Sequence, residues 1–422
     1  MPDLEHSRPL DVHRWSAFPE VRHAVKAVLR RLRGTEAARG GRASLLERHL
    51  TVVLIDLYFG YLCFENGYTA HSRSPNSYAA GSRYNKLRIA YRPLMRVIDG
   101  LADLGLIEHH LGFHDRRPGG QGRQSRMRAT PALIRIIETH CVTQDMIGRA
   151  EGEEVIILRD ADGDDIEYTD TDETRRMRAF VNAYNTALAR ADIRLSAEGI
   201  ALVQAEGIAI DFSRTVVRRI FSHGHFELGG RFYGPWWQSI PKQVRAHLLI
   251  NGLATVERDY RAQHIHILYG MRGKRYADFH DDGDPYALPG HDDVDRSFLK
   301  RVLLIALNAQ DERAALQAIQ SEQNRDPGDR RYTQTQVRAM IASFTAKHAT
   351  IADTLYTGTG LRLQRLDSDI AEHVVGTALN DGILTLSLHD GFIVDGQYDQ
   401  VLIDTMIKVF HKLNLVSIPQ IT

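Results

Sequence analysis

The N-terminal part of the chain carries apolar residues at the three- and four-residue spacing that is typical of helices. This spacing is regular in residues 21–32 (VRHAVKAVLRRL), and residues 50–62 (LTVVLIDLYFGYL) form a denser apolar run. We therefore expect residues 15–60 to be mainly helical. Residues 66–83 are rich in Ser, Asn, Gly and Pro, a composition that predicts a loop.

The next stretch predicts two helices followed by two strands. Apolar spacing indicates helices at Tyr84–Ile89 and Arg92–Leu104, and Gly105 stands where a helix C-cap belongs. Short strands are expected at Leu106–His110 and Ser125–Ala129, with a basic, glycine-rich loop (GFHDRRPGGQGRQ) between them.

The pattern changes after Thr143. Acidic, strand-like segments (VIILRD and IEY) predict a domain boundary near residues 145–170, and residues 173–205 return to a helical pattern. From Arg218 onwards strands and helices mix. We expect an α+β chain with one domain over residues 1–145 and a second over residues 146–422.

Composition describes a globular protein without a membrane span. The chain has 422 residues, 43% of them hydrophobic, and no apolar run of about 18 residues. The N-terminus lacks the order of a signal peptide, and the two cysteines, Cys63 and Cys141, suit a reducing compartment. A cytoplasmic protein without membrane partners is therefore expected, with its oligomeric state open.

Net charge is zero, but the charges are unevenly distributed. Between Gly81 and Arg128 there are ten Arg or Lys against four Asp or Glu, whereas residues 151–173 are strongly acidic. A local excess of basic residues favours binding of a phosphate-bearing partner. The alternative is that these basic residues are ordinary solvent-exposed charges.

The helix–helix–strand–loop–strand order over residues 84–130 resembles a winged helix-turn-helix domain of replication initiators and small regulators. The resemblance implies that Lys86 and a set of arginines contact DNA, unless the domain serves protein contacts instead. The arginines are Arg88, Arg92 and Arg96 on the helices and Arg116, Arg117, Arg123, Arg126 and Arg128 on the wing.

An Asp-Tyr pair, Asp259-Tyr260, ends a predicted strand that starts at Thr255 and precedes a helical segment (RAQHIHILYG). This resembles motif A of the family A DNA polymerases and, distantly, of phage-type single-subunit RNA polymerases. The resemblance implies that Asp259 binds two metal ions and that Tyr260 and His264 lie near the nucleotide. DNA polymerases of this family carry Glu at the position of His264, where it excludes a 2′-hydroxyl.

A predicted helix carries Arg296, Lys300 and Asn308, which resembles motif B. Positions i, i+4 and i+12 lie near one helix face, so the three side chains are expected to face one nucleotide. An ordinary basic amphipathic helix is the alternative, and Asn308-Ala309 departs from the aromatic ending of the motif.

A His-Asp pair, His389-Asp390, lies between two apolar segments (LSL and GFIV) and resembles motif C, a hairpin whose turn carries the second metal ligand. His389 would then lie by the primer terminus. Gly391 stands where the family commonly has Glu.

Upstream of motif A, three residues resemble elements that contact template and primer: Arg231 after Gly230, Gln238 in a Gln-x-Ile-Pro segment, and Arg245. An Asp-Pro-Tyr segment at 284–286 also fits the region between motifs A and B.

Polymerase chemistry needs two carboxylates that hold a pair of divalent ions about 4 Å apart. The ordered set of motifs therefore predicts a DNA-directed DNA polymerase with two Mg²⁺ or Mn²⁺ bound by Asp259 and Asp390. DNA template, primer and nucleoside triphosphates would be its partners. Thumb-like helices are expected at about 173–220, and an antiparallel palm with helical fingers over 221–422.

Two alternatives remain open. One is an RNA polymerase or primase-like enzyme, because His264 and Asn308 do not enforce deoxyribose; we expect dNTP use with weak discrimination against NTPs. The other is a DNA-binding initiator or regulator with an inactive palm.

Overall fold

The chain mixes helices with largely antiparallel sheets and is an α+β protein, as predicted. The computed structural model describes residues 4, 7–36, 42–63, 67–114, 122–208, 210–212, 214–281, 283–325 and 331–422. None of the helices in these ranges is both long and apolar enough to cross a bilayer.

Two compact units make up the chain. The first comprises Met1–Val155 and Val203–Arg214, and the second comprises Ile156–Leu202 and Thr215–Thr422. The division at Val155 lies within the boundary region predicted near residues 145–170, ten residues beyond the predicted end of the first domain, and the segment expected to be thumb-like is shared between the two units.

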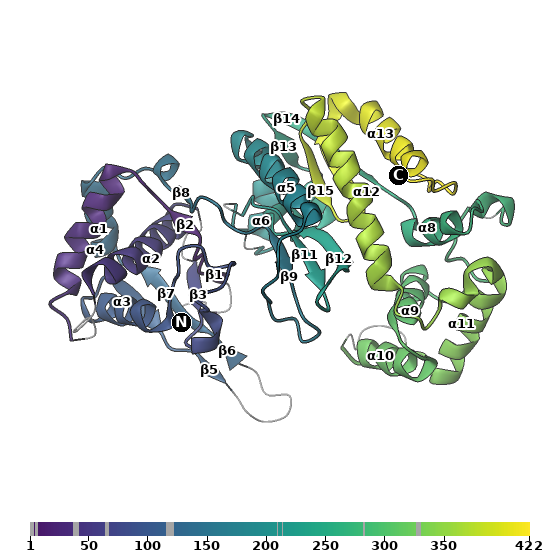
Figure 1. Ribbon diagram of the computed structural model, residues 1–422, viewed down its shortest axis with the longest axis horizontal. Coiled ribbons are helices and arrows are strands. Elements are labelled where there is room, and N and C mark those ends of the chain that lie inside the picture. The colour runs from purple at the N-terminus through teal and green to yellow at the C-terminus, as the bar shows by residue number, and fades with distance from the viewer. Residues whose placement is uncertain are drawn as a thin grey trace. The chain divides into compact units, whose positions relative to one another are not determined.

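The first unit packs helices on a four-stranded sheet of order β1-β3-β7-β4 (Figure 1). Its buried apolar residues, among them Val25, Leu54 and Ile98, form one core. The helices are α1 Pro19–Leu32, α2 Ala43–Cys63, α3 Tyr91–Asp103 and α4 Pro131–Thr139. The strands are β1 Ser7–Pro9, β3 Tyr68–His71, β4 Ile107–His110 and β7 Ser125–Ala129, with two small pairs, β5 Phe113–His114 with β6 Gly122–Arg123 and β2 Arg14–Trp15 with β8 Gly148–Arg149.

Most predicted elements of this unit are confirmed, including both strands after Gly105. Gly105 has a φ of +64°, and the Leu106 amide donates to the Leu101 carbonyl at 2.9 Å, which is a Schellman helix end.

Two predictions for this unit are wrong. Residues 84–89 form turns, because the Asn85 side chain bonds both the amide and the carbonyl of Ile89 at 2.8 Å and so replaces helical bonds. The predicted loop at 66–83 contains strand β3, which is buried throughout and lies between β1 and β7.

The second unit contains a five-stranded antiparallel sheet of order β10-β13-β14-β16-β15 and a three-stranded sheet of order β12-β11-β9. The strands are β9 Ile156–Leu158, β10 Ile193–Leu195, β11 Arg218–Ser222, β12 His225–Tyr233, β13 Leu248–Ile250, β14 Leu253–Asp259, β15 Thr385–Leu388 and β16 Gly391–Asp395.

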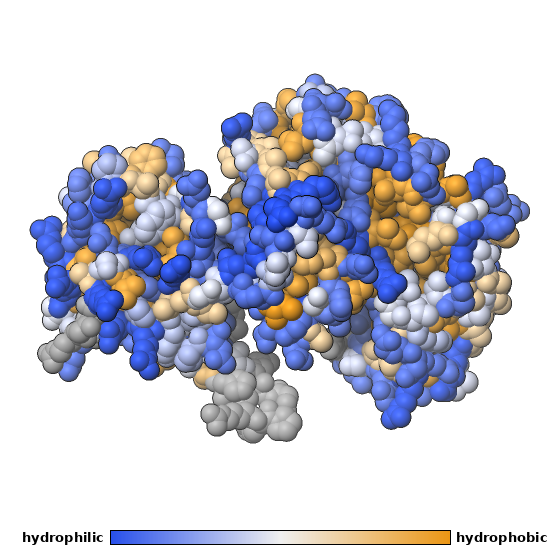
Figure 2. Space-filling view, in the orientation of Figure 1, coloured by the Kyte–Doolittle hydropathy of each residue, from blue (hydrophilic) through white to orange (hydrophobic). Residues whose placement is uncertain are grey.

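Some helices cover these sheets, and others form a separate group around α9 (Figure 1). The long helix α12 packs against β12, β15 and α13, while α9, α10 and α11 pack on one another. In Figure 2, apolar side chains gather on the visible face of this unit beside α12. The helices are α5 Asp172–Arg190, α6 Ala197–Ala205, α7 Lys242–Arg245, α8 Gln263–Met271, α9 Arg296–Asn308, α10 Glu312–Arg325, α11 Gln334–Lys347, α12 Gly360–Asn380 and α13 Asp399–Lys412.

Candidate metal centre

Asp259 and Asp390 lie at one end of the same antiparallel sheet. Asp259 is the last residue of β14 and pairs in register with Gly391, the first residue of β16. Asp390 immediately precedes Gly391 in the two-residue turn between β15 and β16. The predicted strand and hairpin are therefore confirmed, and the register brings the two carboxylates together.

The hairpin turn has an unusual backbone. His389 has a φ of +65°, in the left-handed region that normally favours glycine, and it contacts the Tyr233 ring at a centroid distance of 5.1 Å. A Cβ added to Gly391 would lie 3.2 Å from the Arg258 carbonyl oxygen and 3.6 Å from Asp259 Oδ1. Glycine at position 391 therefore leaves space beside the Asp259 carboxylate.

The carboxylates of Asp259 and Asp390 repel each other electrostatically. Burial and the charge of Asp390 raise the pKa of Asp259 to about 6, although Lys300 acts in the opposite direction. Asp259 Oδ1 is buried and has no hydrogen-bond partner among the described residues. Such an arrangement is costly unless a cation or a proton is present.

Helix α9 carries Arg296, Lys300 and Asn308, as predicted, but the three side chains have different surroundings. Lys300 is exposed and acts electrostatically on Asp259. Arg296 is held by Asp284, with Nε 2.6 Å from Oδ2, and lies 5.1 Å from the centroid of the Tyr286 ring. Asn308 donates to the Leu304 carbonyl of its own helix at 2.7 Å and contacts the first residue of α12, Gly360. The contacts of Asn308 are therefore with α9 and α12.

Tyr260 has a packing role instead of the expected nucleotide contact. It is 2% exposed, its ring contacts Phe392 and Phe410, and its hydroxyl donates to the Met406 carbonyl at 2.7 Å. The strand alternation explains this, because neighbouring side chains point to opposite faces and Tyr260 faces the core.

Arg231 and His264 converge on a residue that the sequence patterns did not mark, Asp367 of α12. His264 Nε2 lies 2.7 Å from Asp367 Oδ2, and Arg231 bonds the same oxygen. Asp367 is buried, which by itself would raise its pKa, but His264 and Arg231 outweigh this effect and lower it. The pKa of Arg231 is raised by Asp367 and also by Asp390, so the network borders the carboxylate pair.

Gln238 and Arg245 brace the sheet. Gln238 Nε2 donates to the carbonyls of Phe232 and Ser387 at 3.1 and 3.0 Å. Arg245 forms a two-point ion pair with Glu257 of β14, with Nε–Oε2 at 2.8 Å and Nη2–Oε1 at 3.0 Å. Both support strands that carry the carboxylates or the Asp390 hairpin.

The predicted DNA-binding arginines divide into exposed and engaged ones. Arg88 and Arg92 are exposed and Arg96 is half-buried, whereas Arg126 donates to the Leu4 carbonyl and Arg128 pairs with Glu108. Arg123 lies 5.5 Å from the centroid of the Phe113 ring. Arg116 and Arg117 lie outside the described residues.

Several polar atoms around the carboxylates are buried without a hydrogen bond to any described residue. Besides Asp259 Oδ1, they are Asp367 Oδ1, Arg231 Nε and His389 Nδ1. Buried polar groups normally form hydrogen bonds, so this concentration of unbonded atoms indicates a place for water or ligand.

Sequence spacing could not reveal Asp367, because it lies 103 residues from His264.

The donor set fits Mg²⁺ or Mn²⁺ in part. Two carboxylates are hard oxygen ligands, and Mg²⁺ in nucleotide-dependent enzymes is bound by one or two carboxylates together with phosphates and water. Among the described residues no group of three potential protein ligands is assembled. The remaining ligands would therefore have to come from substrate and solvent.

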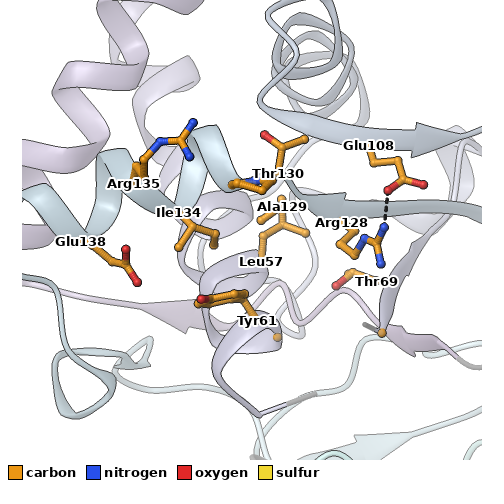
Figure 3. A pocket seen from close by; sticks show the side chains of 13 residues that line it. Leu57, Tyr61, Thr69, Glu108, Arg128, Ala129, Thr130, Ile134, Arg135 and Glu138 are labelled. Atoms are coloured by element: carbon orange, nitrogen blue, oxygen red, sulfur yellow. Dashed lines mark hydrogen bonds and ion pairs between the residues drawn. The ribbon is translucent and has the colours of Figure 1, made fainter. Parts of the chain in front are cut away.

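A cavity of about 520 Å³ lies in the first unit, lined in part by Leu57, Tyr61, Ile134 and the Glu108–Arg128 ion pair (Figure 3). Its acidic and basic side chains are balanced, and no predicted site residue other than Arg128 lines it.

The comparisons with known proteins give no family. No model of a known protein family matches the chain, and it has no significant match among curated proteins.

Proposed function

We propose that the chain is a template-directed nucleotidyltransferase that copies DNA by two-metal-ion catalysis. The observation that carries this proposal is the pairing of Asp259 with Asp390 at one end of a rigid antiparallel sheet, where Asp259 Oδ1 has no hydrogen bond to the described residues. Polymerases need such a pair. In this proposal the five-stranded sheet is the palm, and α9 belongs to the fingers.

Asp259 and Asp390 would hold the two ions, which activate the primer 3′-hydroxyl and stabilise the pyrophosphate that leaves. Lys300 would supply positive charge for the triphosphate, because its exposed ammonium already acts on Asp259 and forms no ion pair within the described part of the chain. Arg296, held by Asp284, would shape the nucleotide side of this region from the first turn of α9.

The first unit would hold the template. Exposed Arg88 precedes α3, exposed Arg92 and half-buried Arg96 lie in its first two turns, and the β4–β7 pair follows as in a winged helix. Phosphate contacts from such arginines position a protein on DNA without reading its sequence.

Primer extension tests the proposal. The full chain is incubated with Mg²⁺ or Mn²⁺, primed and unprimed DNA templates, and labelled dNTPs or NTPs. We expect templated incorporation that Asp390→Asn abolishes and that Asp353→Asn, which alters an exposed ion pair with Arg272, leaves intact. Absence of incorporation by folded wild-type protein under all these conditions would reject the proposal and favour a DNA-binding initiator without catalysis.

An RNA polymerase or primase-like enzyme is the second candidate. It is favoured by the contact between His264 and Asp367, because a histidine held in this way can bond a hydroxyl that a glutamate would exclude.

A further inference from the structure

We propose that Asp367 is a positioning residue that fixes the ring of His264 so that the site favours nucleotides with a ribose 2′-hydroxyl. The inference rests on the proposed nucleotidyltransferase function. It differs from the sequence-based expectation of dNTP use, and it assigns a role to a buried carboxylate that no sequence motif marks.

The first step is the state of the His264 ring. An ionised carboxylate oxygen only accepts hydrogen bonds, so Asp367 Oδ2, 2.7 Å from His264 Nε2, requires a hydrogen on Nε2. Arg231 donates to the same oxygen and completes the charge balance of a carboxylate that is 1% exposed. The contact therefore fixes both the tautomer and the orientation of the ring.

The second step concerns the other ring nitrogen. The contacts of His264 with Asp367 and Arg231 both use Nε2, and no described residue bonds Nδ1. A neutral ring presents Nδ1 as an acceptor, and a protonated ring presents it as a donor. A hydroxyl can satisfy Nδ1 in both states, whereas a methylene can satisfy it in neither.

The third step is position. His264 lies in the first turn of α8, which begins four residues after Asp259, and Arg231 is influenced by both Asp367 and Asp390. A nucleotide whose phosphates are bound at the carboxylate pair has its sugar as the next chemical group. The polar atoms that border the pair are therefore the ones that the sugar meets.

A deoxyribose would leave Nδ1 unpaired inside a partly buried site, which lowers its incorporation relative to ribose by about ten-fold or more. The preference should require Asp367, because without its carboxylate the ring can rotate or change tautomer.

The experiment compares incorporation efficiencies of an NTP, the matching dNTP and its 2′-fluoro analogue on one DNA template. Wild-type protein, Asp367→Asn and His264→Ala are tested. Glu372→Gln is the matched control, since Glu372 is also a buried acid of α12 but binds two arginines, Arg176 and Arg219, and no histidine among the described residues. Thermal unfolding of each variant is recorded.

We expect wild-type protein to prefer the NTP, and Asp367→Asn to lose about ten-fold in NTP efficiency with the dNTP efficiency within about three-fold of wild type. His264→Ala should give the same change even if Asp367→Asn does not fold. Glu372→Gln should leave the NTP-to-dNTP ratio unchanged. The 2′-fluoro analogue, which cannot donate a hydrogen bond, should behave like the dNTP if Nδ1 accepts.

A wild-type preference for dNTPs would overturn the inference, as would equal losses for both sugars in Asp367→Asn and His264→Ala, which indicate a purely structural role. Either result would leave the proposed nucleotidyltransferase intact. Failure of folded wild-type protein to incorporate either sugar would instead reject the proposed function, and the inference with it.

Discussion

Buried carboxylates have opposite charged neighbours in two regions of the molecule. In the first unit, Asp56 is fully buried and bonds two arginines, with Oδ2 2.7 Å from Arg8 Nη2 and Oδ1 2.7 Å from Arg14 Nε. At the end of the β14–β16 pair, Asp259 has another carboxylate, Asp390, as its charged neighbour. The first arrangement is complete within the protein, whereas the second becomes favourable when a cation or a proton binds.

Acids without an arginine partner are uncommon among the buried carboxylates described above. Pairing of an acid with arginines is the common solution in this chain, and Asp367 and Glu372 of α12 follow it too. Repulsion between two acids costs folding free energy, so it identifies the site more sharply than the presence of an Asp-Tyr or His-Asp pair. The comparison predicts that removing charge will have opposite effects on stability in the two regions.

The largest effect is expected at Asp56. Asp56→Asn removes the carboxylate that both Arg8 and Arg14 bond in the core, which should lower the free energy of unfolding of the first unit by about 3–5 kcal/mol. Asp259→Asn should leave the metal-free stability at pH 7.5 unchanged or raise it, because it removes a repulsion. Urea denaturation of the full-length variants measures both. A destabilisation by Asp259→Asn as large as that by Asp56→Asn would show that the Asp259 carboxylate is structurally paired after all.

Lys300→Ala should have the next largest effect, on catalysis. Loss of its charge near Asp259 should raise the activation free energy of incorporation by about 2–4 kcal/mol. This corresponds to a roughly 30- to 1,000-fold loss of incorporation efficiency. Lys347→Ala serves as a control on α11, where the ammonium donates to the carbonyls of Asp284 and Ala287. If Lys300→Ala incorporates nucleotides as well as wild type, α9 is an ordinary basic helix.

Template binding by the first unit should depend steeply on salt. Each phosphate that an arginine neutralises contributes about 0.9 to the slope of log affinity against log salt. Replacing exposed Arg88 and Arg92 by Gln should reduce that slope by about 0.9 for each true contact. Replacing engaged Arg128, which pairs with Glu108, should change it less. Fluorescence anisotropy with duplex DNA at several salt concentrations measures the slopes, and a flat salt dependence would favour a protein-contact role for this unit.

The elements that carry the carboxylates could be predicted because their signals are local. The strand before Asp259 and the hairpin around Asp390 lie in short apolar segments beside the two motifs, and α9 contains the three residues of the motif B spacing. The helix predicted at residues 84–89 does not form, and the reason is equally local, because the Asn85 side chain competes with helical hydrogen bonds.

The rest of the site depends on tertiary structure. Asp367 lies in the middle of an amphipathic helix, 136 residues from Arg231, and nothing in its neighbourhood distinguishes it from a surface acid. Tyr260 could not be assigned from the Asp-Tyr motif either, because its role depends on α13 covering the sheet. Motifs located the carboxylates, but packing decided which neighbours serve them.

The smallest expected effect is a pH dependence of stability that arises from Asp259. Its pKa is raised from 3.8 to about 6 in the folded protein, so the folded state binds the proton more tightly than the unfolded chain does. The stability that this proton gives is fully present below about pH 4 and is lost as pH rises through about 6. After a discount for solvent screening, the loss should be on the order of 1–2 kcal/mol in metal-free protein. Asp259→Asn should remove this component, and urea denaturation between pH 4 and 7.5, with wild type and variant compared at each pH, measures it.

Binding of Mn²⁺ requires the ionised carboxylate, so its affinity should rise over the same pH range and Mn²⁺ should restore the lost stability. Equal pH profiles for the two proteins, with and without Mn²⁺, would show that the two carboxylates do not interact and do not share an ion.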